Sequence, residues 1–325
     1  MQLIETINIL LTVLLTVSFY TLMERKVIAS VQRRVGPNVV GYGGLLQPFA
    51  DGLKAAAKGK SKPWVAPRFI FLMAPILSLT ISLTLWNILP IYPGYGHIDT
   101  TVGILYFIGI SSLGSYGVVL AGWASNSRFA LLGGLRGSAQ VISYEVFLGL
   151  ALVPIILLSQ SLNLYDIMFA QKNCLYIWLM LPLQVIFFVG CLAETNRTPF
   201  DLPEAEAELV AGYNVEYSGF IFAIFFLAEY SSMLFMSALN SILFWGGFFG
   251  PFDLHLLFSF VFGPNALPFL LIIKTVLFAF LFVIVRATFP RYRFDQLMEL
   301  GWKVYLPFVL SYLVIMIQYQ QIVNF

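Results

Sequence analysis

The stretch "LIETINILLTVLLTVSFYTLM", residues 3–23, decides the class of protein to which this chain belongs. It is too long for the apolar part of a cleavable leader, and it matches the roughly 20 residues that a helix needs to cross a bilayer. The whole chain has the same character, because 59% of its 325 residues are hydrophobic, 10% are charged and its mean hydropathy is +0.86. A soluble domain carries about a quarter charged residues. We therefore predict an all-α polytopic membrane protein that forms one domain over residues 1–325.

Apolar runs long enough to cross a bilayer recur along the chain. Counting runs of roughly 20 residues predicts eight spanning helices. Their expected ranges are 3–23, 69–90, 101–124, 139–159, 174–193, 217–240, 266–287 and 303–323. The two halves of the chain share no repeat, so the inverted-repeat architecture of many secondary transporters is not expected.

The basic residues predict the orientation of these helices. The loops after odd-numbered spans carry 16 of the 18 Lys and Arg, nine of them in the first loop, whereas the even-numbered loops and the termini carry only Lys172. Because positive charge is retained on the cytoplasmic or matrix side of a membrane, both termini should face the outer side. The predicted inner loops are 24–68, 125–138, 194–216 and 288–302.

The first inner loop contains a segment that we predict to be an amphipathic helix. In residues 45–58 the apolar side chains fall on one helical face and the polar side chains largely on the other. Pro48 lies in the first turn, where proline is tolerated. The segment is too short to span, so it should lie in the membrane interface. It could anchor the chain to anionic lipid, or it could form a doorway for a lipid-soluble substrate.

Three charged residues fall inside predicted spans. Glu145, Glu229 and Lys274 each cost about 2.5–3.5 kcal/mol at the centre of a spanning helix, so they cannot face lipid. One interpretation is a buried ion pair of Lys274 with Glu145 or Glu229 that fixes the helix register. The other is a hydrated path for protons or ions, because ionisable groups at this depth are functional by default.

Six of the 16 acidic residues gather in the stretch "AETNRTPFDLPEAEAELVAGYNVEY", residues 193–217. They are Glu194, Asp201, Glu204, Glu206, Glu208 and Glu216. A local interpretation is that Asp201 caps a helix whose first turn favours the glutamates. A functional interpretation is that these carboxylates, with Arg197 as the one cation among them, cannot all ionise, so some pKa values rise toward neutrality. Groups of this kind exchange protons at working pH.

Residues that hold redox cofactors are scarce in this chain. Cys174 and Cys191 match no metal spacing, and two thiols are too few for an iron–sulfur cluster. His97 and His255 fall in connecting loops, which disfavours haem ligation within the spans. We expect no iron–sulfur cluster, no haem and no metal site in this chain.

Five segments of the chain resemble one known family. They are "MERK" at 23–26, "QRRVGPNVVGYGGLLQPFADGLK" at 32–54, "GWASNSRFALLGGLRGSAQVISYEV" at 122–146, the acidic stretch above, and "RATFPRYRFDQLMELGWKVYLP" at 286–307. The chain is similar to the first hydrophobic subunit of NADH:ubiquinone oxidoreductase, respiratory complex I. The resemblance covers the chain from Met23 to Pro307, and the run "ETNRTPFDLPE" is specific to that family.

The resemblance implies a set of partners and a substrate. Such a subunit joins the hydrophilic quinone-module subunits to the antiporter-like membrane subunits, and it forms much of the chamber that ubiquinone enters from the lipid. FMN and the iron–sulfur clusters would lie in other subunits. By likeness, the chamber would be lined by Glu24, Arg25, Arg34, Phe49, Asp51, Arg197 and Asp201.

The resemblance also implies a path of carboxylates from the chamber toward the antiporter-like subunits. Its members would be Glu145, Glu194, Glu204, Glu206, Glu208, Glu216 and Glu229, to which the intramembrane Lys274 is added from the reasoning above. One departure limits the transfer of roles. The family usually carries a glutamate soon after the interfacial helix, whereas this chain reads Lys58-Gly59-Lys60-Ser61.

These observations predict a membrane subunit of a redox-driven proton pump that has no activity in isolation. Two alternatives belong to other classes: a proton or cation transporter that uses the intramembrane charges, and a membrane-hydrogenase-type subunit that contacts no quinone. The many Phe residues and short loops favour the mitochondrial inner membrane, with a bacterial inner membrane as the alternative. No nucleic-acid partner is expected.

Overall fold

The computed structural model describes residues 2–59, 63–64, 66–91, 101–203, 209–250 and 267–323, and these residues are mostly helical and contain no strand. Eight of their helices are long and apolar enough to cross a membrane, as the sequence predicts. Several predicted features lie outside the described residues. They are Lys60, His97, His255 and the three glutamates Glu204, Glu206 and Glu208.

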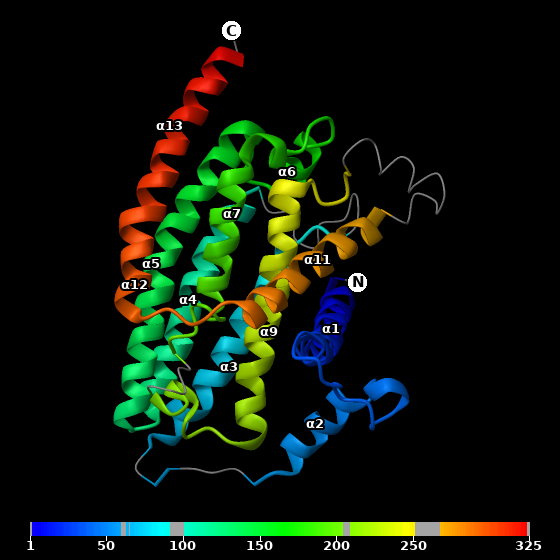
Figure 1. Cartoon of the computed structure of the whole chain (residues 1–325), viewed down its shortest axis with the longest axis vertical. Coiled ribbons are helices and arrows are strands. Elements are labelled where there is room, and N and C mark those ends of the chain that lie inside the picture. The colour runs from blue at the N-terminus through cyan, green and yellow to red at the C-terminus, as the bar shows by residue number, and fades with distance from the viewer. Residues whose placement is uncertain are drawn as a thin grey trace.

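The spanning helices and their connections follow the chain order shown in Figure 1. The long helices are α1 (Gln2–Val31), α3 (Arg68–Leu85), α4 (Gly103–Ala124), α5 (Arg128–Ser159), α7 (Tyr176–Glu194), α9 (Gly219–Trp245), α11 (Leu267–Thr288) and α13 (Leu306–Val323). The short elements are α2 (Gln47–Ala57), α6 (Leu164–Ala170), α12 (Phe294–Glu299), a π-helical stretch at Leu300–Tyr305, and 3-10 turns at Tyr42–Gly44, Trp86–Ile88 and Gly212–Asn214.

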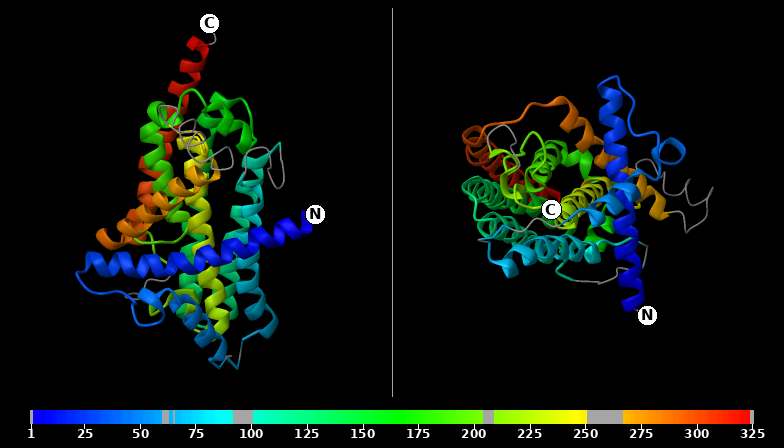
Figure 2. Two further views of the ribbon diagram at one scale, coloured as in Figure 1. Left: turned by 90° about the vertical axis from the view of Figure 1, so that its right-hand side faces the viewer. Right: turned by 90° about the horizontal axis from the view of Figure 1, so that it is seen from below.

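The most buried spanning helix is α9, and it packs against α1, α3, α7 and α11. Figure 2 shows that α1 crosses the bundle at a steep angle to α9 instead of running beside it. In Figure 1, α11 is also inclined, and α13 lies on the outer flank against α5. The apolar core of the bundle lies mainly between α5, α7 and α9.

Three helix boundaries differ from the sequence prediction because polar residues continue the helices. The first helix runs to Val31, so Glu24 and Arg25 are helical and not in a loop. The segment predicted as loop 125–138 is mostly helix, because Ser127 caps α5 by accepting a hydrogen bond from the Ala130 amide at 3.2 Å. The segment predicted as loop 288–302 is helical from Phe294.

Close packing explains why the glycine-rich start of α5 is a helix and not a loop. A Cβ atom on Gly122 of α4 would lie 2.6 Å from the Ala130 carbonyl oxygen of α5. A Cβ atom on Gly133 would lie 2.9 Å from the backbone of Gly212 and Tyr213. Small residues therefore let α5 approach two neighbours at backbone distance, as is common in membrane bundles.

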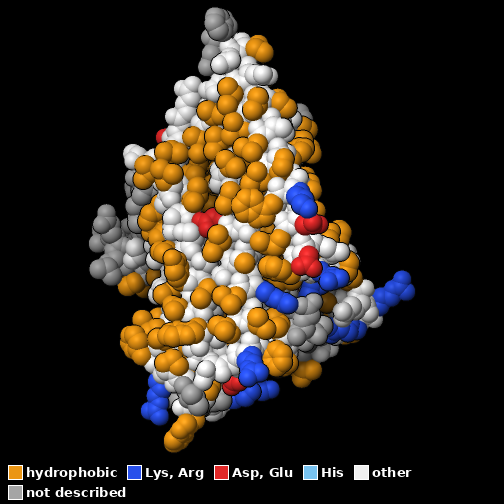
Figure 3. Space-filling view, turned by 90° about the vertical axis from the view of Figure 1, so that its left-hand side faces the viewer, with side chains coloured by type: hydrophobic (Ala, Val, Ile, Leu, Met, Phe, Trp, Pro, Cys, Tyr) orange, Lys and Arg blue, Asp and Glu red, His pale blue; other side chains and the backbone are white. Residues whose placement is uncertain are grey.

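The face formed by α5, α12 and α13 is covered mainly by apolar side chains (Figure 3). Most of the Lys and Arg side chains visible on this face lie in its lower half, toward the end of the bundle where α2 lies in Figure 1, and none lies near its upper end. This separation is the arrangement that the positive-inside rule requires. The side of the membrane that each end faces remains a prediction.

The short helix α2 lies outside the bundle and contacts α1 and α9. Its bounds, its Pro48 in the first turn and its lack of buried residues agree with the predicted amphipathic interfacial helix. Its C-terminal end meets the N-terminal end of α9. A Cβ atom on Gly219, the first residue of α9, would lie 3.1 Å from the Lys58 carbonyl oxygen and 3.4 Å from that of Ala55.

The contact at Gly219 predicts a selective effect of one methyl group. Gly219 has a φ of +62°, where a side chain costs about 1–2 kcal/mol, and its Cβ would push against the last carbonyls of α2. We expect Gly219→Ala to accelerate amide hydrogen exchange in residues 47–58 about 5- to 30-fold in the assembled complex.

Gly52→Ala is the matched control, because Gly52 lies within α2 and has no atom within 4 Å of the added Cβ. In Gly52→Ala, amide hydrogen exchange in residues 47–58 should stay unchanged or slow slightly, since alanine has a higher helix propensity than glycine. Equal exchange in wild type and Gly219→Ala would mean that this contact does not hold α2.

Candidate functional site

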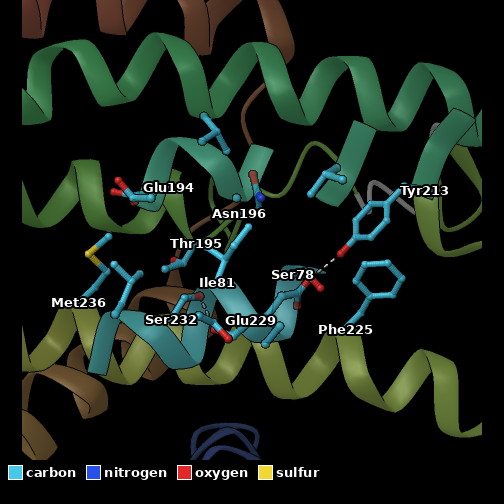
Figure 4. A pocket seen from close by; sticks show the side chains of 17 residues that line it. Ser78, Ile81, Glu194, Thr195, Asn196, Tyr213, Phe225, Glu229, Ser232 and Met236 are labelled. Atoms are coloured by element: carbon cyan, nitrogen blue, oxygen red, sulfur yellow. Dashed lines mark hydrogen bonds between the residues drawn. The ribbon is translucent and has the colours of Figure 1, made fainter. Parts of the chain in front are cut away.

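A cavity of about 100 Å³ lies between α3, α4, α7 and α9, and it holds two of the predicted carboxylates, Glu194 and Glu229. Since one water molecule occupies about 30 Å³ in the liquid, the cavity has room for a few waters. Figure 4 shows Glu194 and Tyr213 at opposite ends of this space. Its polar lining includes Ser78, Ser82, Ser111, Thr195, Asn196 and Ser232.

Two serines of the cavity are oriented as hydrogen-bond acceptors, because the hydroxyls of Ser78 and Ser232 donate to carbonyls of their own helices, those of Pro75 and Glu229. The hydroxyl of Ser111 lies within hydrogen-bond reach of both the Ile108 carbonyl and the Glu194 carboxylate. A hydroxyl that has donated its proton keeps two lone pairs. The cavity wall can therefore accept hydrogen bonds from water or from a protonated carboxyl group.

The end of α7 places Glu194 in the cavity. The helix ends at Glu194, and the following Thr195 donates both its backbone N–H and its hydroxyl proton to the Cys191 carbonyl, at 3.1 and 2.9 Å. The buried Gln140 of α5 then holds the turn, because its amide nitrogen donates to the carbonyls of Ala193 and Phe200 at 2.7 Å each. These bonds satisfy backbone groups at a depth where an unpaired carbonyl is costly.

Glu229 lies on the central helix α9 and has two neighbours from the acidic segment. The Tyr213 hydroxyl donates a hydrogen bond to its Oε1 atom at 2.6 Å. The guanidinium of Arg197 approaches Oε2 at 3.9 Å. Arg197 is only 6% exposed, and its charge also stands over the ring of Tyr230, 4.5 Å from the centroid. Cation–π contacts of this kind stabilise a desolvated guanidinium.

A second buried carboxylate, Glu24 on α1, continues this arrangement. It is 3% exposed and accepts hydrogen bonds from the Tyr230 hydroxyl of α9 and from the Arg286 guanidinium of α11. Glu24, Tyr230, Arg197 and Glu229 thus follow one another in contact, with Arg286 at one end. Three helices and the acidic segment meet in this cluster.

Asp201 lies at the surface end of the cluster and pairs with Arg291 at 2.8 Å. Burial raises the pKa of the Asp201 carboxyl group, and the neighbouring guanidinium of Arg291 opposes that rise, followed by those of Arg197 and Arg286. Its other oxygen, Oδ1, is buried with no hydrogen-bond partner among the described residues.

The remaining predicted chamber residues lie near α1 and α2. Arg25 pairs with Asp51 of α2 at 2.5 Å, and this pair is exposed. Phe49 of α2 is partly exposed and packs edge-on against Phe19 of α1, with ring centroids 6.1 Å apart. Arg34 lies further out and donates to the Gln32 side chain at 2.8 Å.

The structure brings the other predicted path residues together only in part. Glu145 of α5 is half-buried and lies close enough to Glu194 for their charges to interact. Glu216 is half-buried at the end of the acidic segment. Both differ from Glu194 and Glu229 in that neither lines the cavity.

Lys274 lies apart from both carboxylates with which the sequence allowed it to pair. Its ammonium donates to three carbonyls at the end of α9: Trp245 at 2.6 Å, Gly247 at 2.8 Å, and Phe249. A cation in this position satisfies free carbonyls and interacts favourably with the negative end of the helix dipole.

Sequence reasoning missed three partners of the carboxylates: Arg286, Tyr230 and Tyr213. Arg286 was counted only as a basic residue of the inner side, although its place in the last turn of a span indicated that it needs a buried partner. The two tyrosines carried no signal beyond their proximity to Glu229 and the acidic stretch.

The described residues contain no group of three or more His, Cys, Asp or Glu that could hold a metal ion. Cys174 and Cys191 are free thiols.

A family model described as NADH dehydrogenase matches residues 4–317 of this chain. The chain belongs to this family. It is 53% identical over 312 residues to a subunit of the NADH-quinone oxidoreductase of Paramagnetospirillum magneticum, and the match covers 96% of this chain and 90% of that relative. The NADH-ubiquinone oxidoreductase chain 1 of Cyanidium caldarium is 50% identical, with 96% and 89% covered, and that of Arabidopsis thaliana is 51% identical, with 94% and 93% covered.

Family membership confirms the predicted class. The chain is a membrane subunit of an NADH–quinone oxidoreductase, and its eight helices make it a multi-pass protein of the mitochondrial or bacterial inner membrane. Other subunits of that complex are its partners.

The ion pair between Asp201 and Arg291 predicts a pH effect. Removing the guanidinium in Arg291→Gln leaves burial less opposed, so the pKa of Asp201 should rise further and the carboxyl group should stay protonated to higher pH. The infrared band of this carboxyl group, assigned by its loss in Asp201→Asn, should titrate at higher pH than in wild type.

Arg293→Gln is the control, since Arg293 pairs with the exposed Asp295 and not with Asp201. A shift of the Asp201 titration to lower pH in Arg291→Gln would contradict the assignment of Arg291 as its main counter-charge.

Proposed function

We propose that this subunit forms part of the chamber that receives ubiquinone and that it converts the charge change of quinone reduction into proton movement through its carboxylates. The observation that carries the proposal is the continuous cluster from Glu24 through Tyr230 and Arg197 to Glu229, which opens into the cavity containing Glu194. In this proposal the redox groups belong to other subunits, so the chain acts only within the assembled complex.

The chamber residues belong to the side where α1, α2 and the acidic segment meet. The helix α2 presents apolar side chains such as Phe49 and Leu53, and lies against α1 and α9, an arrangement suited to a lipid-soluble ligand entering from the membrane. Arg25 with Asp51, and Arg197 with Asp201 close by in sequence, supply charge at the two ends of this region. The quinone head group would lie between them.

The energy of a single charge pair approaches, without reaching, the energy that switches a two-state element completely. Two unit charges 4 Å apart interact with about 4 kcal/mol at an effective dielectric constant of 20. A bistable element needs about 5.5 kcal/mol to pass from 1:99 to 99:1. A charge change near Arg197 that weakens its 3.9 Å contact with Glu229 therefore shifts proton occupancy in the cavity substantially.

The chamber is tested by labelling the assembled complex with a photoreactive ubiquinone. We expect the photoreactive ubiquinone to form covalent adducts with residues in the segment 24–53, because this segment includes the end of α1 and most of α2. Competition by unlabelled ubiquinone should remove the adducts. Adducts confined to other subunits would contradict the placement of the chamber in this chain.

The proton path is tested by neutralising the carboxylates of the cavity. Glu194→Gln and Glu229→Gln keep the side-chain volume and remove the titrating group, so each should lower quinone-dependent proton pumping on the order of tenfold or more. Glu299→Gln is the control, because Glu299 is an exposed acid that pairs with Lys303 at the surface. Full pumping by both cavity variants would refute the path.

A further inference from the structure

Within the part of the acidic segment that the structure describes, Tyr213 donates a hydrogen bond to Glu229. Its side chain is 2% exposed, and its hydroxyl lies 2.6 Å from Oε1 of Glu229 inside the cavity. Figure 4 shows the phenol entering from the end opposite Glu194. Tyr213 follows the three glutamates of the acidic stretch in sequence, so it links that stretch to the central helix.

Backbone packing fixes the position of Tyr213. The turn Gly212–Asn214 lies directly on α5, where a Cβ atom on Gly133 would be 2.9 Å from the Tyr213 amide nitrogen. The ring then packs edge-on against Phe225, with centroids 5.3 Å apart. The hydroxyl therefore reaches Glu229 from a constrained position.

Tyr217 provides a close structural twin with a different hydroxyl environment. It is also buried, at 5% exposure, and also packs edge-on against Phe225, with centroids 5.0 Å apart. It stacks on Phe71 at 4.1 Å. Its hydroxyl, however, is buried with no hydrogen-bond partner among the described residues. The ring of Tyr217 packs, whereas Tyr213 packs and also touches a carboxylate.

We propose that the hydroxyl of Tyr213 is a proton relay between the water of the cavity on the side of the acidic segment and the carboxylate of Glu229. This inference rests on the proposed proton path and adds a residue to it. The relay needs no charged tyrosine. The phenol oxygen accepts a proton from a hydrogen-bonded water as its own O–H proton passes to Glu229, and that water takes up a proton in turn from a protonated carboxyl group of the path. The tyrosine and the water are therefore both neutral before and after the step.

The chemistry of the hydroxyl suits this role. A phenol oxygen that donates one hydrogen bond can still accept another. The O···O distance of 2.6 Å lies within the range for donation to a carboxylate and within reach for proton transfer. The cavity supplies the space for the water.

The first experiment compares Tyr213→Phe with Tyr217→Phe in the assembled complex in lipid vesicles. Both changes remove one hydroxyl and keep the ring, but only the first removes a bond to Glu229. Tyr213→Phe should lower quinone-dependent proton pumping on the order of tenfold, and Tyr217→Phe should retain wild-type pumping. NADH oxidation by an artificial electron acceptor checks that both variants are assembled.

An infrared readout reports the hydrogen bond itself. Difference spectra between the oxidised and reduced enzyme should contain a carboxyl C=O band that is lost in Glu229→Gln. That band should move to higher frequency in Tyr213→Phe and stay in place in Tyr217→Phe.

A second variant separates a relay from a purely structural contact, and it also serves if Tyr213→Phe does not assemble. Difluorotyrosine at position 213 keeps the ring and the hydrogen bond but makes the phenol more acidic. A relay predicts a shifted pH profile of pumping for this substitution and an unchanged profile for difluorotyrosine at position 217.

Two results would overturn the relay without affecting the proposed function: wild-type pumping by Tyr213→Phe when Glu229→Gln is impaired, or an unchanged pH profile with difluorotyrosine at position 213. Full pumping by Glu229→Gln would also overturn the relay, whose proton acceptor it removes, and full pumping by both Glu194→Gln and Glu229→Gln would refute the proposed path as well.

Discussion

A carboxylate buried in a membrane protein needs a partner, and the pairing of Glu24 governs how three helices meet. Glu24 of α1 accepts from Tyr230 of α9 and from Arg286 of α11. Removing a partner of Glu24 would leave a buried charge uncompensated, which is destabilising although the Arg286 side chain is itself partly exposed. The helix α1 is among the least buried spans and crosses the bundle obliquely, and its apolar contact with the core includes Val13, Val17 and Tyr20. Its polar contacts add to this packing, and they join the predicted chamber to the central helix.

Close contacts fix the position of both ends of α9. At the first residue, Gly219 brings the backbone of α9 against the last turn of α2. At the other end, the carbonyls that follow the helix converge on the ammonium of Lys274. A helix tied at both ends moves little along its axis, so responses to a charge change should occur in side chains such as Arg197 and Glu229. The fixed position of α9 therefore favours a coupling of quinone reduction to proton movement through electrostatics over a coupling through sliding of the helix. It also gives Lys274 a structural role that a cation transporter built on this residue would not need.

Hydropathy predicted the eight spans because it measures the property that a bilayer selects, whereas the helix ends depend on contacts that no local pattern contains. The segment 128–138 contains two arginines and three glycines, and it is helical because α4 and the turn at Gly212 pack against those glycines. The carboxylates of the candidate site could be found from their cost in a membrane, and Glu194 and Glu229 do share a cavity. Their partners could not be found, because Arg286 is 262 residues from Glu24 in sequence and Tyr230 is 206 residues away. The pairing of Lys274 was equally hidden, since its partners are backbone carbonyls.

The separation of Glu194 and Glu229 by a serine-lined cavity bears on how the site could respond to a redox event. Two carboxylates in direct contact share one proton tightly and resist a change in their surroundings. Two carboxylates joined through water and hydroxyl groups have proton affinities that can be changed separately. Glu229 faces Arg197 and the predicted chamber, whereas Glu194 faces Glu145 on α5. In the proposed function, a change of charge in the chamber therefore acts first on Glu229, and the cavity provides the space through which a proton would reach Glu194 without any carboxylate having to cross the bundle.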